Sequence, residues 1–308
     1  MNLFGKNIID LENFSVDEIR LVLDTAAEMK KIVRSDVKKL PNLRGKAIIN
    51  LFLEASTRTR TSFELAGKYL GADVVSINAG TSSITKGESL RDTLLTIEAM
   101  GVDAIVIRHK SEGAAEYATQ IVKPVIINAG DGAHAHPSQA LLDLFTIENA
   151  KGKIDGLKVA IVGDILHSRV ARSDIYGLTK MGAEVHIAGP KTLLPRFFNF
   201  DGVTVHSNIE DAIKNADVVN VLRIQLERQQ AGLFPSPREY ARVFGINDER
   251  LKLAKDDVLI LHPGPQNKGL EISNAVTYGK HSAIHEQVQN GVAVRMALLD
   301  LTLNGGAK

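Results

Sequence analysis

The sequence predicts an α/β protein of two domains. Each domain is a parallel β-sheet flanked by helices, and long helices join the two domains. Short apolar runs alternate with amphipathic helical patterns along almost the whole chain, and this alternation is typical of β-α-β units. Nine such runs in 308 residues fit two sheets better than one. The predicted strands cover residues 46–52, 73–77, 103–108, 124–127, 157–163, 184–188, 203–206, 217–222 and 257–261.

The stretches between these strands carry apolar residues at helical spacing. Examples are residues 89–100, 139–150 and 168–181, and another helix with an apolar face is expected over 286–303. A natural break falls near residues 135–138, where the chain passes into a long helix. We therefore expect one sheet on each side of this break.

Composition narrows the classes of function. Lys and Arg total 37 against 36 Asp and Glu, so no strongly basic surface for nucleic acid is implied. The absence of cysteine excludes disulfides, zinc–thiolate sites and thiol nucleophiles. No stretch reaches the roughly 18 apolar residues of a membrane span. We expect a soluble, cytoplasmic protein whose partners include neither nucleic acid nor a membrane.

The most informative segment is residues 56–61, where hydroxyl and guanidinium groups follow the first apolar strand directly. The first N–H groups of a helix lack internal partners, and the helix dipole favours an anion at that end. Arg58 adds a full positive charge there. A plain helix cap needs one Ser or Thr. This segment has several hydroxyls and two arginines, so it predicts a site for phosphate or carboxylate.

Other polar clusters follow later strands in the same way. Ligands of doubly wound sheets bind beyond the carboxyl ends of the strands. A single arginine at such an end is an ordinary salt-bridge candidate, but guanidinium groups at successive ends match a multiply anionic ligand, or two anionic ligands. The clusters occupy residues 108–109, 131–139, 163–169, 223–228 and 262–265.

Three other interpretations are weaker. His134 and His136 have the spacing of metal ligands, but no nearby carboxylate pair completes a site, so we favour a neutral hydrogen-bonding imidazole and expect no metal. The strand near residue 160 is not followed by G-x-G-x-x-G, and no G-x-S-x-G hydrolase motif occurs. The polar loop 80–88 is either a solvated surface loop or, with its hydroxyls and lysine, a phosphate lid.

Taken together, these segments resemble the aspartate and ornithine carbamoyltransferase family, in order and over essentially the whole chain. Arg223, Gln225 and the proline after His262 resemble the aspartate branch. The cysteine and the Ser-Met-Gly motif of the ornithine branch are absent. The matching segments are residues 52–60, 86–88, 108–109, 136–139, 163–164, 168–169, 222–228 and 262–265.

The resemblance implies transfer of the carbamoyl group from carbamoyl phosphate to the amine of L-aspartate. The products are N-carbamoyl-L-aspartate and phosphate, at the start of pyrimidine biosynthesis, and no cofactor is needed. Ornithine or another amine as acceptor, and a catalytically silent anion-binding homologue, are the alternatives. Residues 1–137 with 287–308 are expected to form the carbamoyl-phosphate domain, and residues 138–286 the aspartate domain.

The resemblance also implies a set of residues for carbamoyl phosphate. Those expected to hold the phosphate are Ser56, Thr57, Arg58 and Thr59. Thr59, Arg108 and His136 are expected to polarise the carbonyl oxygen, as an oxyanion hole does. The carbamoyl amide is assigned to Gln139 and to the backbone of the Pro263, Gly264 and Pro265 segment. No dedicated general base is assigned, because the leaving phosphate can take the proton.

The remaining implied residues concern aspartate and assembly. Those expected to bind aspartate are Lys86, Arg169, Arg223 and Gln225. Ser82 and Lys86 are expected to reach the neighbouring subunit's site, so that active sites are shared in a homotrimer. Glu54 and Arg228 are expected to pair when the domains close. The resemblance leaves open whether regulatory chains or dihydroorotase join the trimer, and what the loop variant at 266–270 does to closure.

Overall fold

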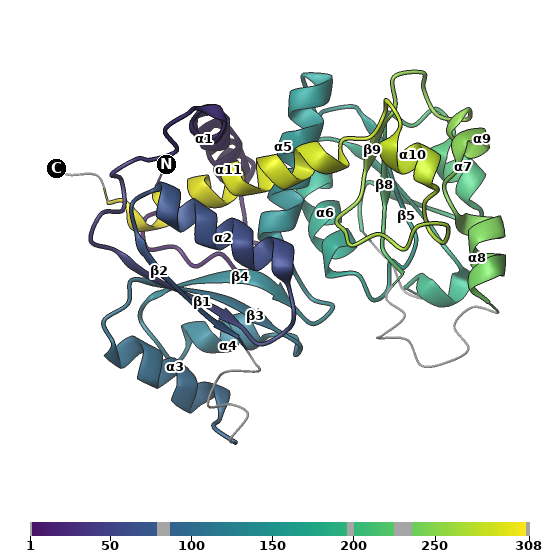
Figure 1. Cartoon of the computed structure of the whole chain (residues 1–308). Coiled ribbons are helices and arrows are strands. Elements are labelled where there is room, and N and C mark those ends of the chain that lie inside the picture. Colours follow the sequence, from purple (N-terminus) through teal and green to yellow (C-terminus); the bar gives the residue numbers. More distant parts are fainter. Residues whose placement is uncertain (1, 79–86, 196–199, 225–235, 306–308) are drawn as a thin grey trace. The chain divides into compact units, whose positions relative to one another are not determined.

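The computed structural model describes residues 2–78, 87–195, 200–224 and 236–305 (Figure 1). The chain divides into two compact units. Unit 1 contains Met1–Leu142 and Val288–Lys308, and unit 2 contains Asp143–Gln287. Each unit is built around one parallel sheet, as the alternation of strands and helices predicts.

Unit 1 has a four-stranded parallel sheet in the order β2-β1-β3-β4. Its strands are β1 (Ala47–Phe52), β2 (Asp73–Asn78), β3 (Ala104–His109) and β4 (Val125–Asp131). Every residue of β4 is buried, which is usual for a parallel strand covered on both faces. The helices in sequence order are α1 (Val16–Arg34), α2 (Thr57–Tyr69), α3 (Leu90–Ala99) and α4 (Ala114–Thr119).

Helices cover both faces of this sheet (Figure 1). On one face, Leu94 of α3 and Ala115 of α4 pack with Ile105 of β3 in one apolar cluster. On the other face, α2 lies so close that a Cβ at Gly67 would stand 2.6 Å from Val74 Cγ2 and 3.9 Å from Leu299 Cδ1. Leu299 belongs to α11 (Ile284–Leu303), so the C-terminal helix completes the layer that carries α2.

Unit 2 has a five-stranded parallel sheet in the order β7-β6-β5-β8-β9. Its strands are β5 (Lys158–Val162), β6 (Glu184–Ala188), β7 (Val203–His206), β8 (Val218–Val221) and β9 (Leu259–Leu261). The helical elements are α5 (Pro137–Lys151), which begins in unit 1, α6 (Arg169–Lys180), η3 (Lys191–Leu193), α7 (Ile209–Ile213), α8 (Pro237–Phe244), α9 (Asp248–Leu251) and α10 (Asn274–Tyr278).

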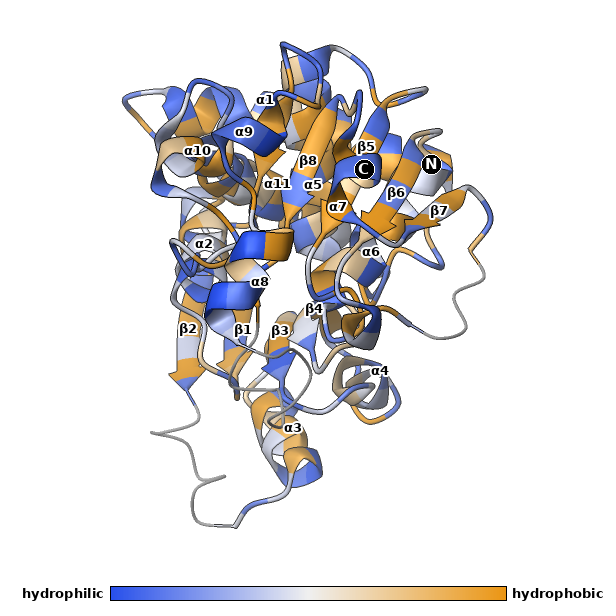
Figure 2. Ribbon diagram, turned by 90° about the vertical axis from the view of Figure 1, so that its right-hand side faces the viewer, coloured by the Kyte–Doolittle hydropathy of each residue, from blue (hydrophilic) through white to orange (hydrophobic). Residues whose placement is uncertain are grey.

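The two faces of this second sheet differ at β8. Val219 and Val221 pack into an apolar cluster with Ile209 of α7 and Val276 of α10. The residue between them, Asn220, points to the opposite face because side chains alternate along a strand, and there it contacts α6. Figure 2 shows the hydrophobic colours concentrated in strands such as β8 and the hydrophilic colours on α9.

Each of the nine predicted strands is present within a few residues of its expected bounds. The predicted helices at 89–100, 139–150, 168–181 and 286–303 correspond to α3, α5, α6 and α11. The units divide at Leu142/Asp143 and Gln287/Val288, whereas the expected domain boundaries were 137/138 and 286/287. The first division falls inside the continuous helix α5, where no interruption of the sequence pattern marks it.

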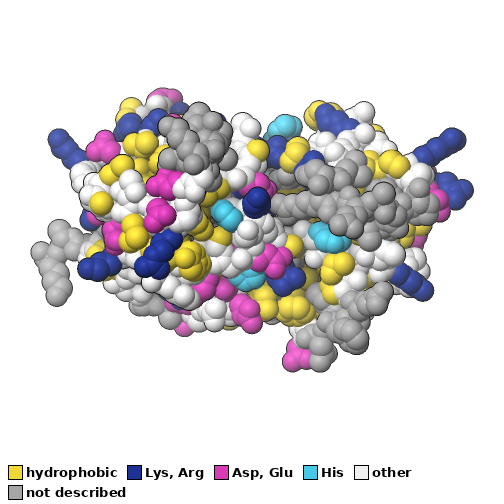
Figure 3. All heavy atoms as spheres, turned by 90° about the horizontal axis from the view of Figure 1, so that it is seen from below, with side chains coloured by type: hydrophobic (Ala, Val, Ile, Leu, Met, Phe, Trp, Pro, Cys, Tyr) yellow, Lys and Arg dark blue, Asp and Glu magenta, His cyan; other side chains and the backbone are white. Residues whose placement is uncertain are grey.

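Positive and negative side chains are interspersed on the face of the described chain that is shown in Figure 3. No basic patch dominates this face, in agreement with the formal net charge of +1. None of the helices in the described part of the chain is long and apolar enough to cross a membrane.

Candidate active site

The start of α2 differs from the other serine-capped helix starts of this chain. Ser56 occupies the N-cap position with an extended backbone (φ −160°, ψ 103°), yet its side chain makes no capping hydrogen bond. Ser15 and Ser168, at the same position of α1 and α6, each accept a backbone N–H. The first turn of α2 also lacks an acidic residue. Its hydroxyl groups and positive dipole end are therefore arranged to receive an anion.

Arg108 lies next to this turn because β3 is the neighbour of β1. In the register of the two strands, Arg108 is paired with Phe52, the last residue of β1. The guanidinium donates from Nη2 to Glu54 Oε1 at 3.1 Å and from Nη1 to the carbonyl of Ala129 at 3.2 Å. The Arg108 side chain is 12% exposed, so these bonds hold a mostly buried cation at the carboxyl end of the sheet.

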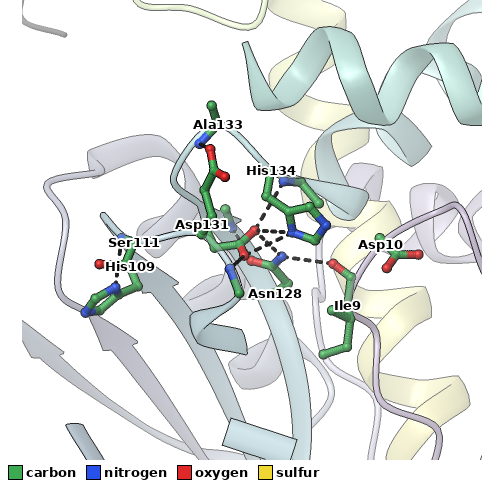
Figure 4. Close-up of polar contacts among 12 residues, drawn as sticks. Ile9, Asp10, His109, Ser111, Asn128, Asp131, Ala133 and His134 are labelled. Carbon is green, nitrogen blue, oxygen red and sulfur yellow. Dashed lines mark hydrogen bonds and ion pairs between the residues drawn. The ribbon is translucent and has the colours of Figure 1, made fainter. Parts of the chain in front are cut away.

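A buried carboxylate organises the loop after β4, as Figure 4 shows. Asp131 accepts hydrogen bonds from Asn128 Nδ2 at 2.8 Å, from the Gly113 N–H at 2.7 Å and from the Ala135 N–H at 3.2 Å. The ring of His134 contacts the same carboxylate at 3.1 Å. His134 is therefore a partner of Asp131. The described residues contain no group of three or more His, Asp or Glu side chains that could hold a metal ion.

His136 and Gln139 follow this loop at the start of α5. The His136 carbonyl accepts the backbone N–H groups of Gln139 (3.0 Å) and Ala140 (3.3 Å), which forms the first turn of the helix. The side chains of His136 and Gln139 are both buried. The ends of β1, β3 and β4 thus bring the 56–59 turn, Arg108 and the loop to His136 to one edge of the unit 1 sheet.

His109, which follows Arg108, is neutral in this arrangement. Its Nδ1 accepts the backbone N–H of Ser111 at 2.9 Å, so the ring hydrogen is on Nε2. Burial lowers the pKa of His109 below its usual value, which also disfavours the charged form.

In unit 2, the turn between β5 and α6 positions Arg169. The buried Asp164 accepts the His167 N–H at 3.2 Å and contacts the His167 ring at 2.9 Å. Ser168 then caps α6 by accepting the Ala171 N–H at 3.1 Å. Arg169 is the first residue of α6 and is buried. The turn requires glycine at position 163, because φ is +130° and a Cβ would stand 3.1 Å from the Leu222 Cβ.

Arg223 lies at the same edge of the unit 2 sheet. β5 and β8 are neighbours, with Val162 paired to Val221, and Arg223 follows β8 after one residue. The sheet therefore places two guanidinium-bearing residues, Arg169 and Arg223, after the ends of adjacent parallel strands. This is the position at which ligands of parallel sheets bind.

The segment Pro263, Gly264 and Pro265 follows β9, the other neighbour of β8. His262 fixes its course, because His262 Nδ1 accepts the Gly264 N–H at 2.8 Å and Nε2 contacts Glu271 Oε1 at 3.2 Å. Gly264 has a φ of +63°, which favours glycine. The bond from Gly264 leaves the ring hydrogen on Nε2, facing the buried Glu271. His262 therefore serves to shape the segment.

The structure does not test the placement of four predicted site residues. Ser82, Lys86, Gln225 and Arg228 lie outside the described residues. Glu54, which the family resemblance pairs with Arg228, contacts Arg108 in unit 1. The organising roles of Asp131 and Glu271 are not predicted from the sequence. A signal existed for Asp131, which begins the polar cluster 131–139 after the predicted strand 124–127, whereas nothing in the local sequence distinguishes Glu271.

Comparison with known proteins identifies the family. Residues 6–149 match the model of the carbamoyl-P binding domain of aspartate/ornithine carbamoyltransferases, and residues 155–302 match that of the Asp/Orn binding domain. The chain therefore belongs to the aspartate/ornithine carbamoyltransferase family, and the resemblance found in the sequence is confirmed.

Similar proteins within the family include several of the aspartate branch. The chain is 61% identical over 308 residues, 100% of each chain, to the aspartate carbamoyltransferase catalytic subunit of Pelotomaculum thermopropionicum. It is 60% identical to that of Desulforamulus reducens over 98% of this chain and 96% of the relative.

Solved structures of both branches share the fold. Aspartate transcarbamoylase of Trypanosoma cruzi in complex with carbamoyl aspartate and phosphate has a TM-score of 0.86 and 32% identity, covering 98% of this chain and 96% of that chain. Ornithine carbamoyltransferase of Pyrococcus furiosus has a TM-score of 0.88 and 30% identity, with 100% of both chains covered. Fold similarity alone therefore does not choose the acceptor amine, and the side chains of unit 2 must decide it.

Proposed function

We propose that this chain transfers the carbamoyl group of carbamoyl phosphate to the amine of L-aspartate, giving N-carbamoyl-L-aspartate and phosphate for pyrimidine biosynthesis. The observation that carries the choice of aspartate is the placement of Arg169 and Arg223 after adjacent strands of unit 2. Two guanidinium groups match the two carboxylates of aspartate, whereas the ammonium group of ornithine would be repelled. The names of the curated relatives support the same choice.

Unit 1 supplies the groups for carbamoyl phosphate. The N–H groups and hydroxyls at 56–59 hold the phosphate, together with the charge of Arg58. Thr59, Arg108 and His136 donate to the carbonyl oxygen, whose negative charge grows as the amine attacks. Because these donors are fixed before the reaction, they stabilise the tetrahedral oxyanion without further reorganisation.

The reaction requires a neutral attacking amine and a departing phosphate. The amine of aspartate forms the new C–N bond, the oxyanion collapses, and the bond from carbon to the phosphate oxygen breaks. The proton lost by the amine is taken by the departing phosphate, so no separate base is assigned. Gln139 and the carbonyl groups at Pro263–Pro265 accept hydrogen bonds from the carbamoyl amide and orient its carbon toward the amine.

The remaining assignments follow the family pattern. Arg169, Arg223 and Gln225 bind the carboxylates of aspartate, with Lys86 and Ser82 supplied by a neighbouring subunit of a homotrimer. Glu54 and Arg228 take part in domain closure, and Glu54 reaches Arg108 in the state described here. A cytoplasmic location stays a prediction from the sequence.

The test is an assay of the purified chain with carbamoyl phosphate and either L-aspartate or L-ornithine. We expect carbamoylation of aspartate and little of ornithine. Arg223→Ala should raise the KM for aspartate far more than the KM for carbamoyl phosphate. Similar kcat/KM values for the two amines would refute the choice of aspartate. Binding of carbamoyl phosphate without any product would favour a silent anion-binding homologue.

A further inference from the structure

A group of buried polar side chains in unit 2 has no role in the chemistry above. Its members come from four different elements and are each 3% exposed or less: Asp143 of α5, Asp174 of α6, Asn220 of β8 and Gln287 of α11. Burying polar groups costs free energy unless they bond to one another.

Hydrogen bonds connect this group to the segment after β9. Gln287 Nε2 donates to Asp143 Oδ1 at 2.6 Å, and Gln287 Oε1 accepts the backbone N–H of His262 at 2.9 Å. His262 immediately precedes Pro263, the start of the segment assigned to the carbamoyl amide. Asp143 and Gln287 are also the first and last residues of unit 2, so their bond joins the two ends of that part of the chain.

The other side of Asp143 faces a second carboxyl group. Asp143 and Asp174 are within hydrogen-bonding reach of each other, and Asp174 Oδ2 accepts Asn220 Nδ2 at 2.8 Å. Two ionised carboxylates have only acceptors, so a bond between them requires one proton. Asp174 Oδ1 receives no hydrogen bond from the described residues and is available to carry that proton.

The surroundings favour a proton on Asp174. Burial, followed by the charge of Asp143, raises the pKa of Asp174 well above its usual value. The neighbours contributed by β8 and α11, Asn220 and Gln287, are uncharged. The titratable ring near the end of β9, that of His262, is directed to Glu271. Asp143 accepts a hydrogen bond from Gln287 and can accept a second one from the protonated Asp174.

We propose that Asp143 and Asp174 share one proton and act, through Gln287, as positioning residues for the Pro263–Pro265 segment. The ionised Asp143 accepts only, so it orients the Gln287 amide with NH₂ toward itself and oxygen toward the His262 N–H. A reversed amide would place a donor against that N–H and displace the segment. This inference rests on the proposed function, because the segment is assigned there to the carbamoyl amide.

Binding of two different ligands distinguishes an effect on the Pro263–Pro265 segment from an effect on the phosphate site. Phosphonoacetamide carries a phosphonate and a carboxamide, whereas inorganic phosphate lacks the amide. Gln287→Glu cannot donate to Asp143, and Gln287→Met keeps the length without hydrogen bonds. Both variants should weaken phosphonoacetamide about tenfold or more by calorimetry and leave the Kd of phosphate unchanged. Equal effects on both ligands, or no effect on either, would overturn the positioning role.

Matched variants of Asp174 test whether Asp143 and Asp174 share a proton. Asp174→Asn can still donate to Asp143, so it should keep phosphonoacetamide affinity within about twofold, whereas Asp174→Ala should lose it as the Gln287 variants do. Wild-type affinity should fall at high pH as the shared proton dissociates, and Asp174→Asn should not show this fall. Asp217→Asn, at a buried carboxylate that instead bonds Lys158 and Lys255, is the control and should leave affinity unchanged.

Isotope labelling of the aspartate carboxyl groups of the chain allows their protonation to be measured without an enzyme assay. NMR titration of the full chain should show an Asp carboxyl whose pKa is raised well above that of an ordinary aspartate, and this signal should be lost in Asp174→Asn. Absence of such a signal would refute the shared proton, even in an active enzyme. A protonated pair in a chain that fails to carbamoylate aspartate would instead refute the proposed function.

Discussion

The carboxylate of Asp131 accepts a hydrogen bond of 3.2 Å from the backbone N–H of Ala135, the residue before His136. The same buried carboxylate holds the N–H of Gly113 at 2.7 Å, at the start of α4. One side chain therefore fixes the loop that delivers His136 to the end of the unit 1 sheet.

Replacement of Asp131 should lower kcat, although Asp131 is assigned no contact with substrate. In Asp131→Asn, one acceptor oxygen becomes an NH₂ group that opposes the backbone N–H donors. We expect a stability loss of about 1–3 kcal/mol for buried donors left without a partner. The kcat should fall by up to about 10²-fold as His136 moves.

The matched control contacts the same loop from the segment that precedes α4. Glu112 accepts the Ala133 N–H at 3.2 Å from an exposed position. Glu112→Gln keeps an acceptor there, so kcat and the thermal midpoint should stay near wild type. If Asp131→Asn were as mild as Glu112→Gln, the loop would not depend on Asp131.

His136 should matter mainly in the transition state. The charge on the carbonyl oxygen develops only as the amine attacks, so the donor gains strength at that point. His136→Ala should lower kcat by about 10²–10³-fold, as expected for one lost oxyanion-hole donor. Steady-state kinetics at saturating substrates measures this. A loss confined to KM would mark His136 as a ground-state binding residue.

A histidine pair on β6 and β7 predicts part of the loss of folding stability at acid pH. His186 Nδ1 and His206 Nε2 are 2.7 Å apart. Burial, and then the charge of Lys158, lowers the pKa of His186 from 6.5 to about 4. Between these values the unfolded chain binds a proton that the folded chain does not, so stability falls as the pH falls from 6.5 to 4.

His186→Gln removes this titration and can still bond to His206. Its thermal midpoint should therefore fall less than that of wild type over the same pH range. His285→Gln, at an exposed histidine of α11, serves as control and should follow wild type. An identical fall in wild type and His186→Gln would show that the pair does not contribute.

Hybrid assembly tests the shared site. If Lys86 enters the neighbouring subunit's site, Lys86→Ala and Arg58→Ala should each be nearly inactive alone. Mixing the two after dissociation and reassembly should restore part of the activity, because some sites then combine an intact Arg58 with an intact Lys86. No recovery in verified mixed trimers would place Lys86 outside the neighbour's site.

The sequence by itself determined the elements and indicated which polar segments follow the ends of strands. Apolar runs separated by helical patterns locate all nine strands, because strand and helix periodicities are local properties. The segment 56–61 was recognisable since its excess of hydroxyls and arginines follows a strand directly. Arg169 and Arg223 could be grouped because the parallel strands that precede them end at one edge of the same sheet.

Only the tertiary structure decided which side chains hold these groups in place. Asp143 and Gln287 are 144 residues apart and meet at 2.6 Å, and no local pattern encodes that contact. Asp174 falls within an ordinary amphipathic helix, and its carboxyl is unusual because burial, and then the charge of Asp143 on α5, raises its pKa. The division of the chain inside α5 was hidden for the same reason. Periodicity is set by neighbours in sequence, whereas burial and pairing are set by which elements pack together.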